Sequence, residues 1–339
     1  MELGDFRRNN FNNDIAIRYA TASADAFTHA LNTNSRKDAE KIVADALFNP
    51  GFCGNRAIVC ALNNKYSDLA LRMVMDPRVD PAANDNVLMR AAVSNGEIEI
   101  VKILLADERD SSSIPIALST AVIFSEIEIL KILLKDSRAQ LSDGLIHCAI
   151  RFNRTDTLKL LLDDHRVKCR EDSNYLIIAI MHNSVGSVAI LLAHPRIDPS
   201  VSNNHAIRVA SDCGYIEIVQ MLLEDRRVDP SVRNNIAFRS VAWKGYENIM
   251  YRLLADPRVN PCAKNNRALG NASVQGHYGI VKTLLGVCVG TVGQYISLKN
   301  RLPYEINTLW VEYLSKHYWV VKEFARIHLL VDLIREIMT

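Results

Sequence analysis

The chain has 339 residues, 49% of them hydrophobic, and its 40 basic and 38 acidic side chains leave a net charge of +2. This balance argues against a nucleic-acid partner, which would need a basic stripe. No run of sequence reaches the roughly 18 apolar residues that a membrane span requires, and residues 1–8 lack the apolar core of a signal peptide. We therefore expect neither nucleic acid nor a membrane as a partner.

The seven cysteines are scattered, form no C-x-x-C pair and are odd in number. This usage does not indicate a disulfide framework and is typical of reduced packing residues. We expect an intracellular protein of the cytoplasm or nucleus.

One phrase recurs along the chain. Residues 75–81, 193–199, 224–230 and 255–261 read M-D-P-R-V-D-P, A-H-P-R-I-D-P, E-D-R-R-V-D-P and A-D-P-R-V-N-P. The arginine of the phrase returns at a nearly constant spacing, at Arg78, Arg109, Arg138, Arg166, Arg196, Arg227 and Arg258. A period of about 30 residues predicts a solenoid of stacked units, each too small to bury a core alone.

Each unit is predicted to form two helices and a loop. In residues 203–230, Asn203 and Asn204 predict a turn, and the apolar spacing that follows predicts a first helix to about residue 212. Gly214 is suited to end that helix in a left-handed conformation. A second helix then carries Leu222 and Leu223 inward, and the repeated phrase forms the loop after it.

The other units repeat these positions. The helix-breaking position holds Lys65, Gly96, Ser125, Asn153, Asn183, Gly214, Gly245 and Gly276. Shortly before it stands a small side chain, at Ala61, Ala92, Ala121, Ala149, Ala179, Ala210, Val241 and Ala272. The apolar pair of the second helix is Met73/Val74, Leu104/Leu105, Leu133/Leu134, Leu161/Leu162, Leu191/Leu192, Leu222/Leu223, Leu253/Leu254 and Leu284/Leu285.

In chain order, residues 1–54 come first and contain a degenerate unit. Residues 16–20 match the first helix of a unit, and Asn49-Pro50 lies one repeat period before Asp80-Pro81. We expect residues 21–37 to be an insertion between the two helices of this unit. Eight regular units follow over residues 55–285.

These units resemble ankyrin repeats, whose signature is T-P-L-H-x-A. The matching segments are residues 86–92, 204–210 and 235–241, in which Arg90, Arg208 or Arg239 stands where the family has histidine. The Thr-Pro is missing, and P-R-V-D-P replaces the usual finger sequence. This variant is similar to the ankyrin sets of giant DNA viruses and their protist hosts. The resemblance implies that the protein could also act inside a host cell. The resemblance implies an all-α solenoid with short finger loops and a C-terminal helical cap.

The resemblance also implies a binding surface. In the family, partner proteins touch the fingers and the last exposed turn of each first helix, on the concave face. The corresponding positions give nine candidate residues: Ile123, Phe124, Arg151, Phe152, Met181, His182, Asp212, Trp243 and Lys244. Large apolar side chains beside arginine are typical of binding hot spots. The alternative is that the third to fifth units, which are shorter than the others, are irregular and these side chains pack inside.

Two other patterns have structural and functional interpretations. The repeated arginines could form a phosphate-binding stripe, but an acidic residue usually lies two positions before each one, at Asp76, Asp107, Asp136, Asp164, Asp225 and Asp256. We favour ion pairs that join a finger to a helix end. The paired asparagines, such as Asn234 and Asn235, are predicted to form turns rather than a binding code.

The period stops after Leu285. Residues 286–301 are predicted to be a linker, and residues 302–339 contain two amphipathic helices that would cap the array. The first of them resembles the opening of an F-box, as in poxviral ankyrin proteins. The matching positions are Leu302, Pro303, Glu305, Ile306, Val311, Tyr313 and Leu314, and Trp310 departs from the pattern. That resemblance implies docking on the Skp-family linker of a cullin ubiquitin ligase.

No nucleotide-binding, zinc-protease or serine-hydrolase motif occurs in the sequence. We therefore expect no catalytic residue, metal or cofactor, and a monomeric scaffold that binds a partner protein. Two alternatives stay open: a substrate adaptor of a ubiquitin ligase and a purely structural spacer.

Overall fold

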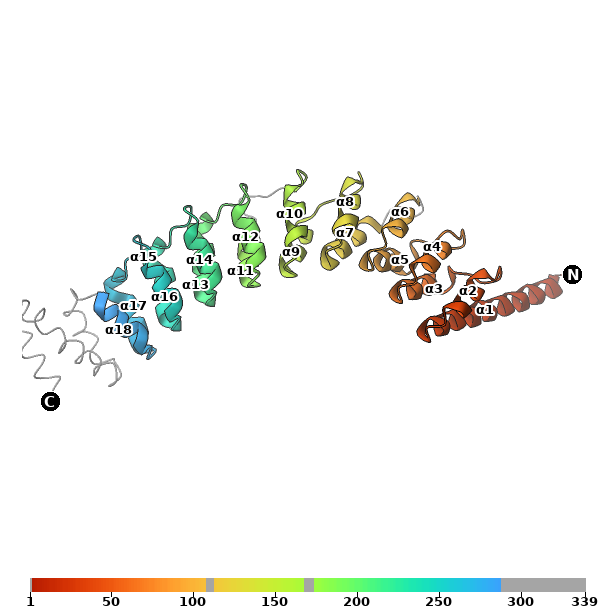
Figure 1. Cartoon of the computed structure of the whole chain (residues 1–339), viewed down its shortest axis with the longest axis horizontal. Helices are drawn as coiled ribbons and strands as arrows, with labels where there is room; N and C mark the ends of the chain where they lie inside the picture. The colour runs from red at the N-terminus through yellow and green to blue at the C-terminus, as the bar shows by residue number, and fades with distance from the viewer. Residues whose placement is uncertain (1, 108–112, 168–173, 288–339) are drawn as a thin grey trace, which may run out of the picture. The chain divides into compact units, whose positions relative to one another are not determined.

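The computed structural model describes residues 2–107, 113–167 and 174–287, which form 18 α-helices and no strand (Figure 1). This confirms the predicted all-α class. The chain divides into two compact units, residues 1–167 and 168–339, which we describe separately. Among the described residues no helix is both long and apolar enough to cross a membrane.

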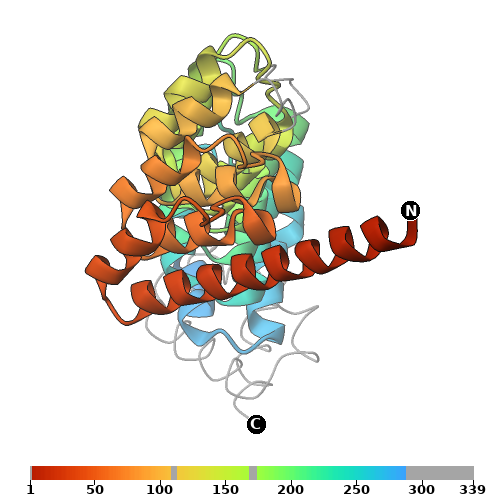
Figure 2. The same ribbon diagram turned by 90° about the vertical axis from the view of Figure 1, so that its right-hand side faces the viewer.

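The first unit contains five pairs of helices. Their bounds are α1 Glu2–Asn32, α2 Arg36–Ala44, α3 Phe52–Asn63, α4 Ser67–Val74, α5 Ala83–Ser94, α6 Ile98–Ala106, α7 Ser113–Phe124, α8 Ile127–Lys135, α9 Asp143–Arg151 and α10 Thr155–Asp163. Odd-numbered helices, the first helices of each pair, pack against one another in sequence, and so do the even-numbered second helices. The unit therefore consists of two layers of helices. The N-terminal part of α1 extends past the other helices of this unit (Figure 2).

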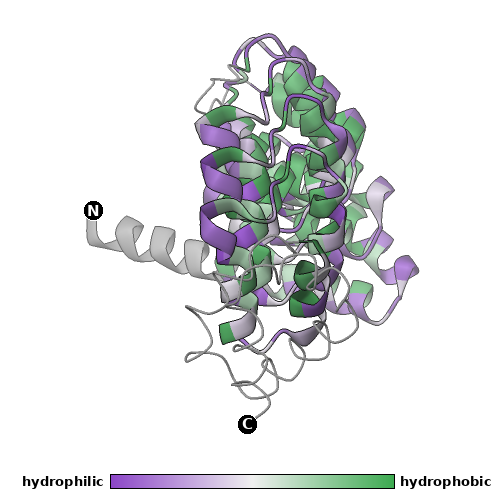
Figure 3. Ribbon diagram, turned by 90° about the vertical axis from the view of Figure 1, so that its left-hand side faces the viewer, coloured by the Kyte–Doolittle hydropathy of each residue, from purple (hydrophilic) through white to green (hydrophobic). Residues whose placement is uncertain are grey.

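The second unit repeats this arrangement with four pairs. Their bounds are α11 Tyr175–Met181, α12 Val185–Ala193, α13 Val201–Cys213, α14 Ile216–Glu224, α15 Val232–Lys244, α16 Glu247–Leu254, α17 Ala263–Val274 and α18 Tyr278–Val287. Individual helices carry both apolar and polar stretches (Figure 3), as expected of helices that bury one side.

The predicted small residues and the first member of each apolar pair form the core, whereas five second members, Leu105, Leu134, Leu192, Leu223 and Leu254, are only half-buried. All eight small residues, Ala61 to Ala272, are 0% exposed, which lets neighbouring first helices approach closely. The first member of every apolar pair, from Met73 to Leu284, is also buried. Burial of the same positions in every pair is the packing that a solenoid requires.

The predicted helix breaks are confirmed. Each break has a positive φ, from 49° at Asn153 to 83° at Gly214. Lys65 and Ser125, which lack the usual glycine or asparagine, adopt the same conformation with φ of 65° and 64°. The backbone path is therefore kept even where the side chain does not favour it.

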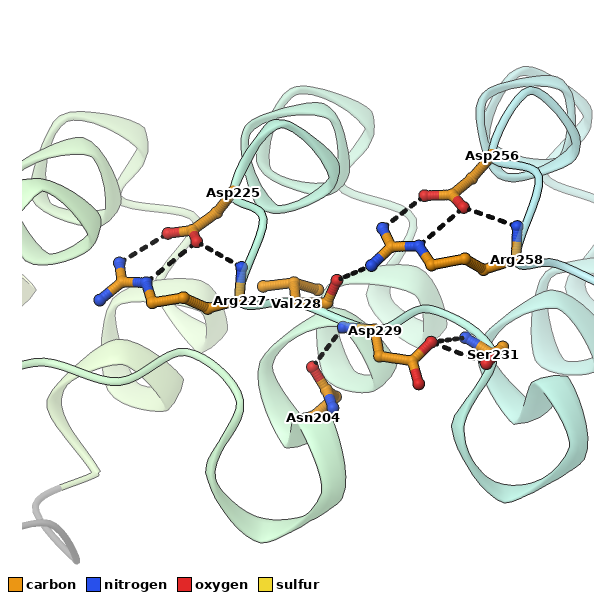
Figure 4. Close-up of polar contacts among 8 residues, drawn as sticks. All are labelled: Asn204, Asp225, Arg227, Val228, Asp229, Ser231, Asp256 and Arg258. Atoms are coloured by element: carbon orange, nitrogen blue, oxygen red, sulfur yellow. Dashed lines mark hydrogen bonds and ion pairs between the residues drawn. The ribbon is translucent and has the colours of Figure 1, made fainter.

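A second left-handed element precedes five of the first helices. Three consecutive residues have positive φ before the regular part of α3, α5, α13, α15 and α17, for example Ser202, Asn203 and Asn204. The third residue is always a buried asparagine, and Asn204 Oδ1 accepts a hydrogen bond from the Asp229 backbone N–H at 2.7 Å (Figure 4). The asparagines are thus turn formers, as predicted. Helix α9 instead begins directly after extended Ser142, in one of the shorter units.

The arginines of the repeated phrase hold the fingers in place, as predicted. Arg227 pairs with Asp225 (Figure 4). It also donates to the carbonyl of Ile197 in the preceding finger and to that of Leu192 in α12. Arg258 in turn donates to Val228 O at 2.7 Å. Equivalent ion pairs join Arg78 to Asp76, Arg138 to Asp136 and Arg166 to Asp164. Arg109 lies outside the described residues.

The predicted insertion at residues 21–37 is wrong. Helix α1 runs without interruption to Asn32, and Asn34, with a φ of 58°, is the helix break of the first pair. Ala30 is buried and occupies the small position that the prediction gave to residues 16–20. The prediction missed this position because it expected the first helix to end near residue 20, whereas α1 continues to Asn32. The finger was placed correctly: Phe48 O accepts from Arg78 as Val228 O does from Arg258.

Candidate functional site

The candidate residues of the first unit lie at corresponding ends of two packed helices. Phe124 ends α7 and is 53% exposed, and Phe152, directly after α9, is 44% exposed. Ile123 is half-buried, and its carbonyl accepts a hydrogen bond from Arg154 Nε at 2.9 Å. The guanidinium of exposed Arg151 lies 5.8 Å from the Phe152 ring centroid, within cation–π range.

The candidate residues of the second unit lie at the ends of α11, α13 and α15. Met181 is 64% exposed and Trp243 is 45% exposed, while His182, Asp212 and Lys244 are also exposed. Asp212 accepts a hydrogen bond from the Ser240 hydroxyl of the next first helix. The backbone carbonyl of Trp243 is hydrogen-bonded to the His277 ring at 2.9 Å. In each unit taken by itself, we call the exposed side of the first helices the first-helix face of that unit.

The first-helix face includes residues that are not among the nine candidates. Val274, at the end of α17, is 53% exposed and occupies the position equivalent to Trp243. Arg208 and Arg239 also lie on the first helices, where their guanidinium groups donate to carbonyls of the left-handed turns. The sequence did contain a signal for these two residues, because arginine replaces the histidine of the ankyrin family at both positions.

The pKa values of the paired aspartate and arginine side chains in the fingers are shifted. The pKa of Asp225 is lowered, chiefly by its hydrogen bonds from the Arg227 side chain and against the effect of burial, and the pKa of Arg227 is raised. The pKa values of Asp76, Asp136, Asp164 and Asp256 shift in the same direction for the same leading cause. These arginines are committed to structural contacts, which disfavours the phosphate-stripe interpretation.

Groups suited to metal binding do not converge in the part of the chain that the structure describes. No three His, Cys, Asp or Glu side chains are arranged there to hold a metal ion. Among the described residues, Cys53, Cys60, Cys148, Cys213 and Cys262 form no disulfide. The predicted adaptor residues Leu302, Pro303, Glu305, Ile306, Trp310, Tyr313 and Leu314 lie outside the described residues.

Comparison with known families gives the class of protein. A family model of ankyrin repeats, in three copies, matches residues 145–234, which run from α9 into α15. With the stacked helix pairs and finger loops, this match shows that the fold is an all-α ankyrin-repeat solenoid. Ankyrin repeats generally mediate protein–protein interactions through extended surfaces and are typically not catalytic. No curated protein matches the chain.

Proposed function

We propose that this protein is a non-catalytic scaffold that binds a partner protein on its first-helix face. The observation that carries the proposal is the exposure of large apolar side chains at equivalent helix ends. Phe124 and Phe152 are exposed in this way in the first unit, and Met181 and Trp243 in the second. The core of each unit is filled by other residues, so these side chains are not needed to complete it.

The chemistry of the four side chains supports binding rather than a purely structural role. Aromatic residues and arginine dominate the energy of protein interfaces because they bury a large area with few rotatable bonds. Phe152 carries Arg151 beside it, and Trp243 is followed by Lys244. A structural spacer would have no use for apolar groups in water at these positions.

The experiment is quantitative affinity capture with the full chain from an extract of the cells that express it. We expect the double variant Phe124→Ser/Phe152→Ser to lose the captured partner while its circular dichroism stays that of the wild type. Tyr251→Ser is a matched control, because Tyr251 is 47% exposed but lies on the second helix α16. Unchanged capture by the double variant would contradict the proposal, and loss of helicity would show that the rings are core residues.

The ubiquitin-ligase adaptor is a second proposal that rests on the F-box-like pattern of residues 302–314 alone. A pull-down with the Skp-family linker tests it. Binding by the wild type and its loss in Leu302→Ala/Pro303→Ala would support the adaptor. Absence of binding by the wild type would leave residues 302–339 with the proposed capping role.

A further inference from the structure

The first helices of the second unit are unusually basic. Helices α13, α15 and α17 carry one carboxylate, Asp212, against six cations: Arg208, Arg233, Arg239, Lys244, Lys264 and Arg267. The corresponding helices of the first unit are balanced, since α5 has Asp85 and Arg90 and α9 has Asp143 and Arg151. The excess positive charge is therefore local, although the whole chain carries only +2.

The described residues offer these six cations no ion-pair partner. Within the described residues none of them takes part in an ion pair, whereas the finger arginines Arg227 and Arg258 do. The single carboxylate of the three helices, Asp212, accepts a hydrogen bond from the Ser240 hydroxyl and forms no ion pair with any described cation. The finger carboxylates Asp198 and Asp229 act on the finger arginines Arg227 and Arg258, whose pKa values they help to raise.

The cations lie close enough to repel one another. The pKa of Arg208 is lowered by burial and by Arg233, and that of Arg239 by burial and by Arg267. Burial, Arg208 and Arg233 also lower the pKa of His205. Arg208 and Arg239 are held in position by turn carbonyls, and the buried Nε of Arg208 has no hydrogen-bond partner in the structure. Uncompensated, partly buried positive charge favours a negatively charged partner.

Resting on the proposed function, we infer that the first-helix face of the second unit binds an acidic peptide segment of the partner, with apolar side chains between its carboxylates. The second unit also exposes Met181, Trp243 and Val274 at the ends of α11, α15 and α17, and Lys244 directly follows Trp243. A peptide that alternates acidic and apolar residues complements both sets. A nucleic acid would complement only the charges and the single Trp243 ring, without use for Met181 and Val274.

Fluorescence anisotropy with the full chain tests this inference. The probes are a labelled peptide of four Glu-Glu-Leu repeats, the same peptide with lysine in place of glutamate, and a single-stranded DNA oligonucleotide of equal charge. We expect the acidic peptide to bind, the lysine peptide not to bind, and binding to weaken as salt is raised. Equal binding of both peptides, or tighter binding of the oligonucleotide, would overturn the inference.

Charge reversal locates the binding. Arg233→Glu/Arg267→Glu changes two exposed residues of the face, and we expect it to weaken binding of the acidic peptide about tenfold or more. Arg252→Glu/Lys282→Glu, exposed on second helices α16 and α18, is the matched control and should bind as the wild type does. Equal effects of both double variants would refute the inference. The proposed function would still stand if Phe124→Ser/Phe152→Ser lost the captured partner.

Discussion

At the scale of single residues, a buried asparagine joins a left-handed turn to the finger that follows the same helix pair. Asn204 reaches Asp229 and Asn235 reaches Asn260, in both cases by accepting from the backbone N–H at 2.7–2.8 Å. Asparagine suits the position because it tolerates positive φ and carries an amide that can accept from the finger. The sequence pattern predicted the turns but not these bonds, since both helices of the pair separate each asparagine from its partner along the chain.

Replacing Asn204 by alanine tests this role. The change leaves the Asp229 N–H without its acceptor and should lower the free energy of unfolding by about 1–3 kcal/mol more than a turn change alone. Asn203→Ala is the matched control, because Asn203 has nearly the same φ, 56°, but is exposed. Urea denaturation of both variants measures the difference, and equal destabilisation would show that the hydrogen bond contributes nothing.

The ion pairs of the fingers predict a dependence of stability on pH. The pKa of Asp225 and of Asp256 is lower in the folded chain than the ordinary value of 3.8, chiefly through the paired arginine. A lowered carboxylate pKa stabilises the folded state above the unfolded pKa, and this contribution is lost as pH falls through the lower folded pKa.

The double variant Asp225→Asn/Asp256→Asn should therefore be less stable than the wild type at pH 6, with the difference shrinking as pH falls below about 4. Denaturation at a series of pH values measures it. A difference in unfolding free energy that stayed constant from pH 6 to the acid limit would rule out ionisation as the cause.

At the scale of elements, the helix breaks depend on conformation more than on residue type. Glycine and asparagine made six of the eight breaks predictable, and Lys65 and Ser125 adopt the same positive φ although their side chains do not favour it. The predicted candidate site followed from these breaks, since its residues are the one or two before each. The break residues alone did not predict which side chains of the next helix pair lie against them.

Two glycine substitutions separate conformation from packing. Gly245 has a φ of 81°, and a Cβ there would lie 2.5 Å from His277 Cε1, whereas a Cβ on Gly276, with a φ of 73°, would meet nothing within 4 Å. Both alanine variants should lose about 1–2 kcal/mol to the left-handed backbone, and Gly245→Ala about 1–3 kcal/mol more through the clash. Thermal or urea unfolding would contradict this reasoning if Gly276→Ala were the more damaging.

At the scale of the whole molecule, the repeat period was sufficient to predict the class of fold. Periodic leucines, small residues and breaks all follow from one rule, that every unit must bury the same side against its neighbours. The rule failed at the N-terminus, where α1 runs unbroken from Glu2 to Asn32 and conceals its unit. The sequence analysis also missed the basic first-helix face of the second unit, because it considered only the total charge of +2, in which local excesses of either sign cancel.

The central claim is that stability in this chain comes from packing between adjacent helix pairs rather than from one shared core. Hydrogen exchange of the full chain carrying Leu222→Ala tests it most directly. Leu222 is 0% exposed in α14. Its truncation should therefore cost about 2–5 kcal/mol. We predict faster exchange in α13–α16 and unchanged exchange in α3–α8. A uniform increase over both sets of helices would contradict the claim, because it would mean that the chain unfolds as a single globule.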